Sequence, residues 1–353
     1  MKGQLKDGDP MTYRVAVTKG YAEEDGSTIF GDIGLSRLTQ AGLEWKVLPQ
    51  KMGHLAADQL EGFDAALVLG AERVTEESLP AGGRLRHIAR FGAGFDAVDV
   101  EACTRRGVLL TNCPDAVRRP VADSAIALLF ALAHNLVIKD RLVREGRWDE
   151  RAAWRGSGLD GATVGIVGLG GIGLETARLV RALGIRTVAY NRSDRRREAD
   201  ALGVEVLALD SVLAQSDYLI ITVAANAGTR RLIGERELSL MKPTSRLINL
   251  ARGSVVDEEA LIRRLSDGRL AGAGLDVFER EPLDVKSPLV AMDNVILAPH
   301  SLCWTDSFTD AVSGSVMESI IDASQGVVPR NAVNPEAWAG HREPQGAGTA
   351  HVG

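Results

Sequence analysis

A glycine-rich turn between an apolar strand and a helix constrains this chain more than any other feature. Residues 163–173 read Thr-Val-Gly-Ile-Val-Gly-Leu-Gly-Gly-Ile-Gly, in which Gly168, Gly170 and Gly173 form G-x-G-x-x-G. The run Thr163–Val167 predicts a strand, and the apolar spacing after the turn predicts a helix. Such glycines allow a tight bend, close approach of the backbone to a ligand, and close packing of helix on strand. We therefore expect a dinucleotide site, with the pyrophosphate on the amides at the helix N-terminus.

The end of the next expected strand indicates which dinucleotide is preferred. A site specific for NAD has an aspartate or glutamate there, about 20 residues after the motif, to bind the ribose 2′-hydroxyl. This chain has Asn191, Arg192 and Ser193, with further arginines at 195–197. A neutral residue does not repel a 2′-phosphate, and a guanidinium can bind one with two hydrogen bonds. We expect NADP(H) to be preferred, with NAD(H) as the alternative; the arginines also suit the solvated start of a helix.

Short apolar runs alternate with helix-length segments along most of the chain, which predicts parallel α/β sheets. Strands are expected at Arg14–Val17, Trp45–Leu48, Ala65–Leu69, Ile88–Phe91, Val108–Leu110, Thr163–Val167, Thr187–Tyr190, Tyr218–Val223, Arg246–Asn249, Gly272–Val277 and Val295–Leu297.

Three further segments carry predictions of their own. The segment Val121–Leu136 is apolar nearly all round, which indicates a helix that is buried or forms an oligomer contact. The charged segment Arg141–Trp154 is expected to be an exposed connector. An apolar residue every fourth position at 308, 312, 316 and 320 predicts a helix with one apolar stripe. The polar, glycine-rich tail from residue 336 is expected to be disordered.

Composition narrows the class of protein. No run of about 20 apolar residues is present, and the N-terminus lacks the apolar core of a signal peptide. The formal net charge of −6 has the wrong sign for binding a phosphate backbone. The three cysteines, Cys103, Cys113 and Cys303, show no metal-type spacing and fit a reducing compartment. We expect a cytoplasmic protein that uses no metal, nucleic acid or membrane.

Polar residues that could perform chemistry follow three apolar runs. Arg252 follows the run ending at Asn249, Glu281 follows Gly272–Val277, and His300 follows Val295–Leu297. Open α/β sheets present ligands at the carboxyl ends of their strands, so these three side chains are expected at one edge. Each residue alone would more often be structural, but all three behind a cofactor motif favour an active site.

Together these segments make the chain resemble the D-isomer-specific 2-hydroxyacid dehydrogenase family over residues 12–335. Besides the glycine motif, the resemblance rests on Phe91–Asp96, Thr111–Pro114, Val121–Asp123, Asn249–Gly253, Asp276–Pro282 and Pro299-His300. It implies an α/β fold in which a Rossmann-type nucleotide-binding domain, residues 113–300, is inserted into a flavodoxin-like substrate domain. The substrate domain would comprise residues 1–112 and 301–335, followed by the tail 336–353.

The resemblance also implies catalytic roles. Arg252 would bind the substrate carboxylate and polarise the 2-oxo group, because its planar donor fork suits a carboxylate. His300 would donate a proton to that oxygen as hydride reaches C2, and accept it back in the oxidation. Glu281 would bind the far ring nitrogen, which fixes the tautomer and favours the protonated ring.

Two sets of binding residues are implied as well. Those for the cofactor, beyond the glycines and residues 191–193, are Gly171, Ile172, Ala251 and Asp276. Those for the substrate are the amides of Ala93 and Gly94, together with Arg252 and Trp304. Trp304 stands where many members have a His-Ile-Gly-Gly-type turn, so it either reshapes the substrate pocket or packs in the core. Cys303 beside His300 is either reactive or a small packed thiol.

The expected activity is reduction of a small 2-oxo acid such as glyoxylate or hydroxypyruvate, by a homodimer. Three alternatives stay open: a phosphoglycerate dehydrogenase, a phosphite dehydrogenase, and an NAD(H)-sensing binding protein of the corepressor type. Phosphoglycerate-specific relatives carry an arginine before Arg73, where this chain has Gly70 and Ala71.

Overall fold

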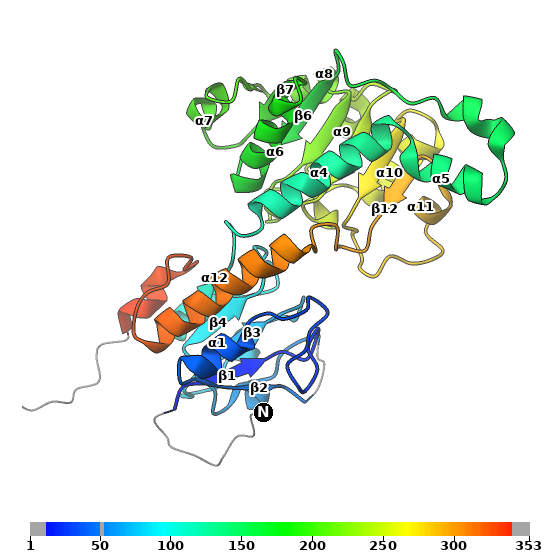
Figure 1. Ribbon diagram of the computed structural model, residues 1–353. Coiled ribbons are helices and arrows are strands. Elements are labelled where there is room, and N and C mark those ends of the chain that lie inside the picture. The colour runs from blue at the N-terminus through cyan, green and yellow to red at the C-terminus, as the bar shows by residue number, and fades with distance from the viewer. Residues whose placement is uncertain (1–11, 50–52, 341–353) are drawn as a thin grey trace, which may run out of the picture. The chain divides into compact units, whose positions relative to one another are not determined.

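The alternation of apolar runs and helices produces two parallel sheets, each in its own unit (Figure 1). The computed structural model describes residues 12–49 and 53–340. Unit 1 comprises Met1–Ala116 and Asp306–Gly353, and unit 2 comprises Val117–Thr305. The boundaries expected from the sequence, 112/113 and 300/301, lie a few residues before the observed ones.

Unit 1 is built on a five-stranded parallel sheet in the order β2-β1-β3-β4-β5. This is the flavodoxin-like order, which confirms that expectation. The strands are β1 (Arg14–Val17), β2 (Glu44–Val47), β3 (Ala65–Val68), β4 (His87–Arg90) and β5 (Leu109–Thr111). Every residue of β3 is buried, as expected for a strand covered on both faces.

The last long helix of the chain belongs to unit 1. α12 (Asp306–Ser324) packs against β4 and α1, and Figure 1 shows it in orange beside them. Phe308, Val312, Val316 and Ile320 are all buried, which confirms the apolar stripe. The other helices of unit 1 are α1 (Leu35–Gln40), α2 (Ala57–Leu60), the single turn η1 (Glu76–Ser78) and α3 (Val100–Arg105).

The end of the described chain is more regular than its composition predicts. Pro335–Gly340 forms a 3-10 helix, η4, and Ala337 is buried. Asn334 anchors the segment, since its Nδ2 donates to Thr104 Oγ1 at 2.9 Å and to the Val108 carbonyl at 3.0 Å. The expectation of disorder is therefore wrong for residues 336–340, because composition does not reveal these long-range contacts. Residues 341–353 lie outside the described residues.

Unit 2 is built on a seven-stranded parallel sheet in the order β12-β11-β10-β9-β6-β7-β8. From β8 to β11 this is the Rossmann order, with the switch point between β6 and β9, as expected. The strands are β6 (Thr163–Val167), β7 (Arg186–Tyr190), β8 (Glu205–Val206), β9 (Tyr218–Ile221), β10 (Arg246–Asn249), β11 (Gly272–Leu275) and β12 (Val295–Leu297). Only β8, two residues long, was not expected from the sequence.

The helices of unit 2 cover this sheet. α4 (Arg118–Ala133) packs against α6 and also touches β10 and β11. The others are α5 (Leu136–Arg144), η2 (Trp148–Trp154), α6 (Gly171–Ala182), α7 (Arg196–Asp200), α8 (Leu209–Gln215), α9 (Glu235–Leu240), η3 (Gly253–Val255), α10 (Glu258–Ser266) and α11 (Pro288–Ala291).

The expected helix over 121–136 ends early, and the expected connector after it is helical. α4 stops before Asn135, whose φ of 51° lies in the left-handed region, and the chain continues as α5 and η2. Asp140 and Arg144, four residues apart, form an ion pair that supports α5. Among the described residues no single helix is long and apolar enough to cross a membrane, although the bent pair α4–α5 has the length and composition.

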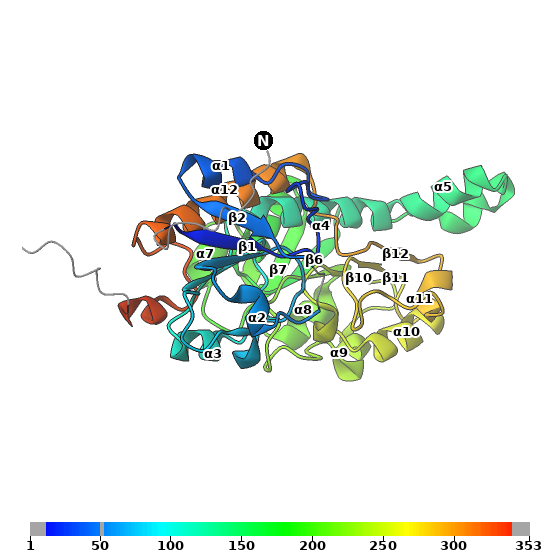
Figure 2. The same ribbon diagram turned by 90° about the horizontal axis from the view of Figure 1, so that it is seen from below.

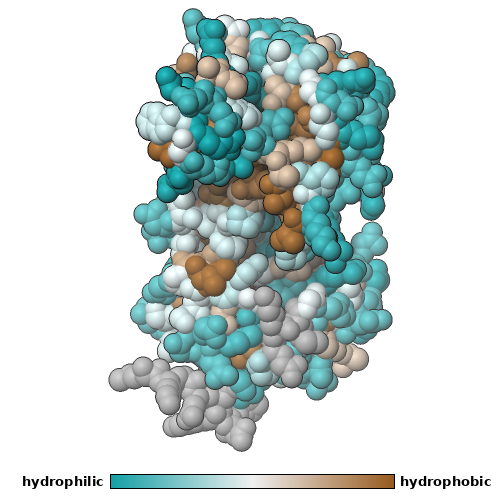
Figure 3. Space-filling view, turned by 90° about the vertical axis from the view of Figure 1, so that its right-hand side faces the viewer, coloured by the Kyte–Doolittle hydropathy of each residue, from teal (hydrophilic) through white to brown (hydrophobic). Residues whose placement is uncertain are grey.

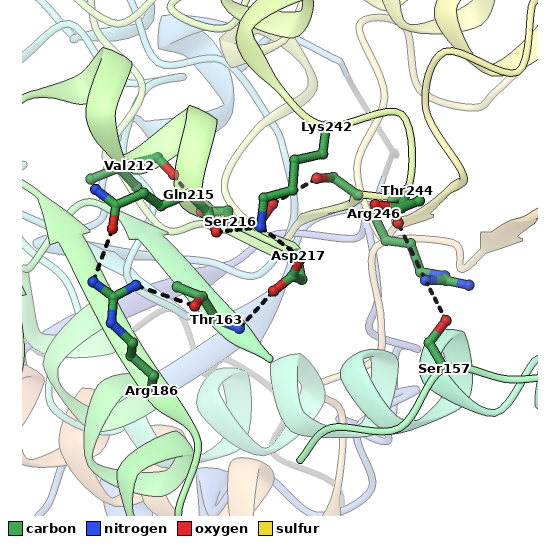
Figure 4. Close-up of polar contacts among 11 residues, drawn as sticks. Ser157, Thr163, Arg186, Val212, Gln215, Ser216, Asp217, Lys242, Thr244 and Arg246 are labelled. Carbon is green, nitrogen blue, oxygen red and sulfur yellow. Dashed lines mark hydrogen bonds and ion pairs between the residues drawn. The ribbon is translucent and has the colours of Figure 1, made fainter. Parts of the chain in front are cut away.

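A polar network fixes the edge of the unit 2 sheet at which the strands begin (Figure 4). The Thr163 amide donates to Asp217 Oδ2, and Lys242 Nζ donates to Asp217 Oδ1, both at 2.8 Å. Arg186 donates to Thr163 Oγ1 and to Gln215 Oε1. These contacts pair the charges next to the strand starts, at the end of the sheet away from the glycine turn.

Candidate functional site

The glycine turn has the conformation that its sequence predicts. Gly168 has a φ of 105°, which favours glycine, and a Cβ there would lie 2.8 Å from the Val223 amide nitrogen. A Cβ on Gly173 would lie 1.8 Å from the Gly168 carbonyl oxygen, so only glycine lets α6 pack this closely. A Cβ on Gly170 would meet nothing within 4 Å. The turn is thus closed on its inner side and open at Gly170.

The open side coincides with the N-terminus of α6. Gly170 is the N-cap of this 12-residue helix and has no capping side chain. The amides of Gly171 and Ile172 therefore lie in a first turn that lacks intrahelical acceptors and carries a partial positive charge. Bare amides around a glycine that leaves space for a ligand fit the pyrophosphate of a dinucleotide.

Asn191 shapes the loop that follows β7. Its Oδ1 accepts from the Leu169 amide at 2.8 Å, and its Nδ2 donates to the Ser193 carbonyl and to Ser193 Oγ, both at 2.9 Å. Arg192 and Ser193 are exposed, and Arg192 Nη1 lies 3.2 Å from the position of a Cβ on Gly228. Asn191 therefore joins the glycine turn to this loop, with an amide where an acid would stand in an NAD-specific site.

His300 and Glu281 form a pair after β12 and β11. His300 Nδ1 lies 2.8 Å from Glu281 Oε2, while Glu281 Oε1 accepts from the Phe278 amide at 3.1 Å. Burial opposes ionisation of Glu281, but the hydrogen bond and charge of His300, the Phe278 amide and the charge of Arg252 together lower its pKa. The carboxylate thus stays ionised and faces one nitrogen of the ring.

Arg252 follows β10 and lies in the same neighbourhood. It precedes η3, its Nη1 donates to the Ala251 carbonyl at 2.8 Å, and its charge acts on Glu281. A Cβ on Gly253 would lie 1.8 Å from the carbonyl carbon of Phe278, so the loops after β10 and β11 are in direct contact. The three residues expected to be catalytic thus follow three adjacent strands of one unit.

Asp276 anchors the backbone next to His300. Its carboxylate is buried and accepts from the Ser301 amide at 2.9 Å and from the Leu302 amide at 3.3 Å. Burial raises the pKa of Asp276, and these two amides act in the opposite direction. Asp276 therefore holds the start of the 301–305 turn.

Cys303 and Trp304 complete that turn. Cys303 is of intermediate exposure, and burial raises the pKa of its thiol to about 12, which disfavours the thiolate form. The Trp304 amide donates to the Ser301 carbonyl at 2.9 Å, and the Trp304 side chain is partly exposed.

In unit 1, the loop after β4 presents a second group of amides. The carbonyl oxygens of this loop accept hydrogen bonds from other residues of unit 1. Gly92 O accepts from the Cys113 amide at 2.8 Å, Ala93 O from Asn112 Nδ2 at 2.6 Å, and Gly94 O from Arg90 Nε at 3.1 Å. Within the described residues, the Ala93 and Gly94 amides have no acceptor. A loop with its carbonyls held and its amides free suits a carboxylate.

Asn112 and Arg90 had no assigned role in the sequence, although Asn112 lies in one of its motifs. Only the folded chain brings Asn112 to Ala93, since nothing in the residue type indicates which carbonyl it binds. No group of three or more histidine, cysteine, aspartate or glutamate side chains that could hold a metal ion occurs among residues 12–49 and 53–340.

Comparison with known proteins agrees with this arrangement. Residues 126–301 match the family model described as D-isomer specific 2-hydroxyacid dehydrogenase, NAD binding domain. The chain is 40% identical over 285 residues to a glyoxylate reductase of Pyrococcus furiosus, covering 79% of this chain and 84% of that one. It is 37% identical over 297 residues to a glyoxylate reductase of Korarchaeum cryptofilum, covering 83% and 89%.

Solved structures resemble it over nearly the whole chain. One is the NADPH-dependent glyoxylate/hydroxypyruvate reductase of Sinorhizobium meliloti in complex with NADP and malonate. It is 32% identical with a TM-score of 0.78, and the match covers 92% of this chain and 98% of that one.

Proposed function

Because the chain belongs to the D-isomer specific 2-hydroxyacid dehydrogenase family, we propose that it is an NADPH-dependent reductase of a small 2-oxo acid, either glyoxylate or hydroxypyruvate. The observation that carries the proposal is the 2.8 Å contact of His300 with Glu281, within the electrostatic influence of Arg252 and at the strand ends of a Rossmann sheet. The glyoxylate reductases of Pyrococcus furiosus and Korarchaeum cryptofilum support this choice of substrate.

The proton is proposed to come from His300. Its Nδ1 is engaged by Glu281, so Nε2 is the nitrogen that faces the substrate and donates to the 2-oxo oxygen. The bound nicotinamide supplies the hydride that reaches C2. An ionised Glu281 stabilises the imidazolium before the transfer and orients the ring, while Arg252 binds the carboxylate and polarises the C2 carbonyl. In the oxidation, the neutral ring takes the hydroxyl proton.

Binding of the rest of the substrate is assigned to a few further groups. Among the described residues the Ala93 and Gly94 amides have no acceptor, which supports them as the proposed donors to a substrate carboxylate. Trp304, on the turn directly after His300, is proposed to limit the size of the substituent on C2. The backbone of Ala251 and the segment held by Asp276 are proposed to contact the carboxamide of the nicotinamide.

NADPH is the proposed cofactor. The phosphates would lie on the amides of Gly171 and Ile172. Asn191 carries no charge that would repel a 2′-phosphate, and its bonds to Ser193 hold the exposed loop in place. The NADP complex of the Sinorhizobium meliloti enzyme supports this preference.

A homodimer in the cytoplasm is the proposed state of the enzyme. Apolar side chains are exposed along one stretch of unit 2, with Leu136 60% and Trp148 59% accessible. α5 extends away from the rest of unit 2 in Figure 2, and Figure 3, which shows the side where α5 lies in Figure 1, has brown residues among teal ones. Burying such a stretch against a second copy is favourable. Free cysteines fit a reducing compartment.

A spectrophotometric assay tests the function. The wild-type chain and a His300→Ala variant are mixed with NADPH or NADH and with glyoxylate, hydroxypyruvate, phosphohydroxypyruvate or, with the oxidised cofactors, phosphite. We expect the wild type to oxidise NADPH with glyoxylate or hydroxypyruvate, and His300→Ala to lose about a hundredfold or more of turnover. NADPH binding that persists in both proteins without turnover of any substrate would contradict the proposal and favour a dinucleotide-sensing protein.

A further inference from the structure

We propose that Arg118, at the start of α4, binds the 2′-phosphate of NADP(H) and thereby sets the cofactor preference. This proposal rests on the proposed use of NADPH and assigns its recognition to a residue outside the glycine motif and outside residues 191–193. Arg118 also precedes residues 126–301, where the family model matches.

The position of Arg118 is defined by its contact with Gly171, the first residue of α6. A Cβ built on Gly171 would lie 2.3 Å from Arg118 Nε and 3.1 Å from Arg118 Cζ. The guanidinium therefore occupies the place that a side chain at position 171 would fill. Arg118 lines the same pocket as Gly170, where the turn is open.

Arg118 lines a pocket of about 360 Å³ on the outer face of α6. The lining residues are Arg118, Gly170, Gly171, Leu174, Glu175, Arg178, Arg195 and Leu202. The volume is at the lower end of the range for small-molecule sites. Three guanidinium groups and one carboxylate thus surround a space that begins at the glycine turn.

The one carboxylate in the lining, Glu175, does not prevent an anion from binding in this pocket. Glu175 lies 2.6 Å from Arg178 and 3.5 Å from Arg119, and its hydrogen bond with Arg178 lowers its pKa. Its charge is therefore already balanced by two arginines. The lining carries three arginines against one carboxylate and so has a net positive charge, although Arg195 is also paired with Glu198 at 2.7 Å.

The location of the pocket favours the 2′-phosphate over the pyrophosphate. Arg195 lies in the connection from β7 to α7, and Leu202 follows α7. In a Rossmann unit the adenosine ribose lies at the end of the second strand, here β7. None of the residues that line the pocket comes from the loops after β9, β10 or β11, on the nicotinamide side. A phosphate on the adenosine ribose is thus the group of NADP(H) that would enter it.

Binding measurements on the full chain test the proposal. Arg118→Met keeps most of the aliphatic stem but removes the charge. Arg144→Met on α5 is the matched control, because Arg144 belongs to the same unit, pairs with Asp140 and does not line the pocket. Dissociation constants are measured for NADPH, NADH, adenosine 2′,5′-bisphosphate and 5′-AMP, and thermal unfolding checks that each variant is folded.

We expect Arg118→Met to weaken the binding of NADPH and of adenosine 2′,5′-bisphosphate by about tenfold or more, as expected for the loss of a charge-assisted hydrogen bond. The dissociation constants for NADH and 5′-AMP should change by less than about twofold, and Arg144→Met should leave all four constants within that range. Arg118→Lys should restore part of the loss, because it restores the charge without the planar fork.

Three results would overturn the role of Arg118: equal weakening of NADPH and NADH binding, an equal effect of Arg144→Met, or no change in any dissociation constant. A wild-type protein that binds NADH more tightly than NADPH would instead overturn the proposed cofactor preference, so the two failures are distinguishable.

Discussion

His300 and Glu281 face each other across 2.8 Å, Nδ1 to Oε2, although 18 residues separate them along the chain and they follow different strands. Glu281 is held from its other side by the Phe278 amide, so the carboxylate cannot turn away without losing a second bond. This pair sets which ring nitrogen remains for the substrate.

Replacing Glu281 by glutamine should lower turnover by about tenfold or more, because an amide stabilises the imidazolium less than a carboxylate does. The fall of kcat/KM for 2-oxo acid reduction on the alkaline side should also move to lower pH. Steady-state assays from pH 5 to 9 measure both effects. An unchanged pH profile with reduced kcat would show that Glu281 only packs against the ring.

The lowered pKa of Glu281 has a consequence for stability. A carboxylate with a lower pKa in the folded than in the unfolded state contributes to the free energy of unfolding above its unfolded pKa, and the contribution is lost as pH falls through the folded one. The wild type should therefore lose stability relative to Glu281→Gln on acidification. Urea titrations of both proteins at pH 7, and at a pH below the usual pKa range of glutamate, test this. A difference in the free energy of unfolding that is the same at both pH values would contradict it.

Replacing Arg252 by lysine should raise KM for the 2-oxo acid by about tenfold or more, since a point charge cannot replace two parallel hydrogen bonds to a carboxylate. The dissociation constant of NADPH should stay unchanged, which fluorescence of the bound nicotinamide reports. A rise in the NADPH constant by the same factor would mean that Arg252 supports the cofactor loop instead.

Replacing Asn191 by aspartate should shift preference towards NADH. The new carboxylate would repel a 2′-phosphate and accept from a ribose 2′-hydroxyl, while still accepting from the Leu169 amide. The ratio of kcat/KM for NADPH to that for NADH should fall by about tenfold or more. Asn191→Ser is the neutral control, and a similar fall there would point to loss of the bonds to Ser193 rather than to repulsion.

Replacing Asn112 by alanine should raise KM for the substrate several-fold while leaving NADPH binding intact. Asn112 is buried and its Nδ2 holds the Ala93 carbonyl, so its loss frees the loop that presents the Ala93 and Gly94 amides. Hydrogen exchange of residues 91–95 should become faster. An unchanged KM together with faster hydrogen exchange would show that this loop does not take part in substrate binding.

Replacing Gly173 by alanine should destabilise unit 2 and weaken both cofactors, because the added Cβ would lie 1.8 Å from the Gly168 carbonyl oxygen. Thermal unfolding and NADPH titration measure this. Gly314→Ala, in α12 with nothing within 4 Å of the Cβ position, is the matched control and should leave the Tm the same or higher.

Local patterns predicted most of the sheet framework, since strand ranges depend on runs of apolar residues that the fold buries. β8 was not predicted, because Glu205–Val206 is too short to form such a run. The positions of Arg252, Glu281 and His300 followed from a general rule about strand ends, so they too were accessible from the sequence.

The sequence did not reveal which side chains contact residues far away along the chain. Asn112 reaches Ala93, Asn334 reaches Thr104, and Arg118 reaches Gly171, and each pairing depends on where helices and loops pass one another. Composition indicated an exposed segment at 141–154 but not that it is helical. The buried face of α5 is formed by Ile138 and Leu142, of which only Leu142 falls in that segment, and η2 buries no residue.

The division of unit 1 into two stretches of sequence has a consequence for its synthesis. The sheet β1–β5 leaves the ribosome first, but the buried stripe of α12 that packs against β4 is made only after all of unit 2. The sheet of unit 1 therefore lacks the cover of α12 while the Rossmann unit is translated. The Rossmann unit is continuous in sequence and can form its own core during that time. Nascent chains ending near residue 305 should be captured by chaperones through these strands, and release should coincide with emergence of the final helix.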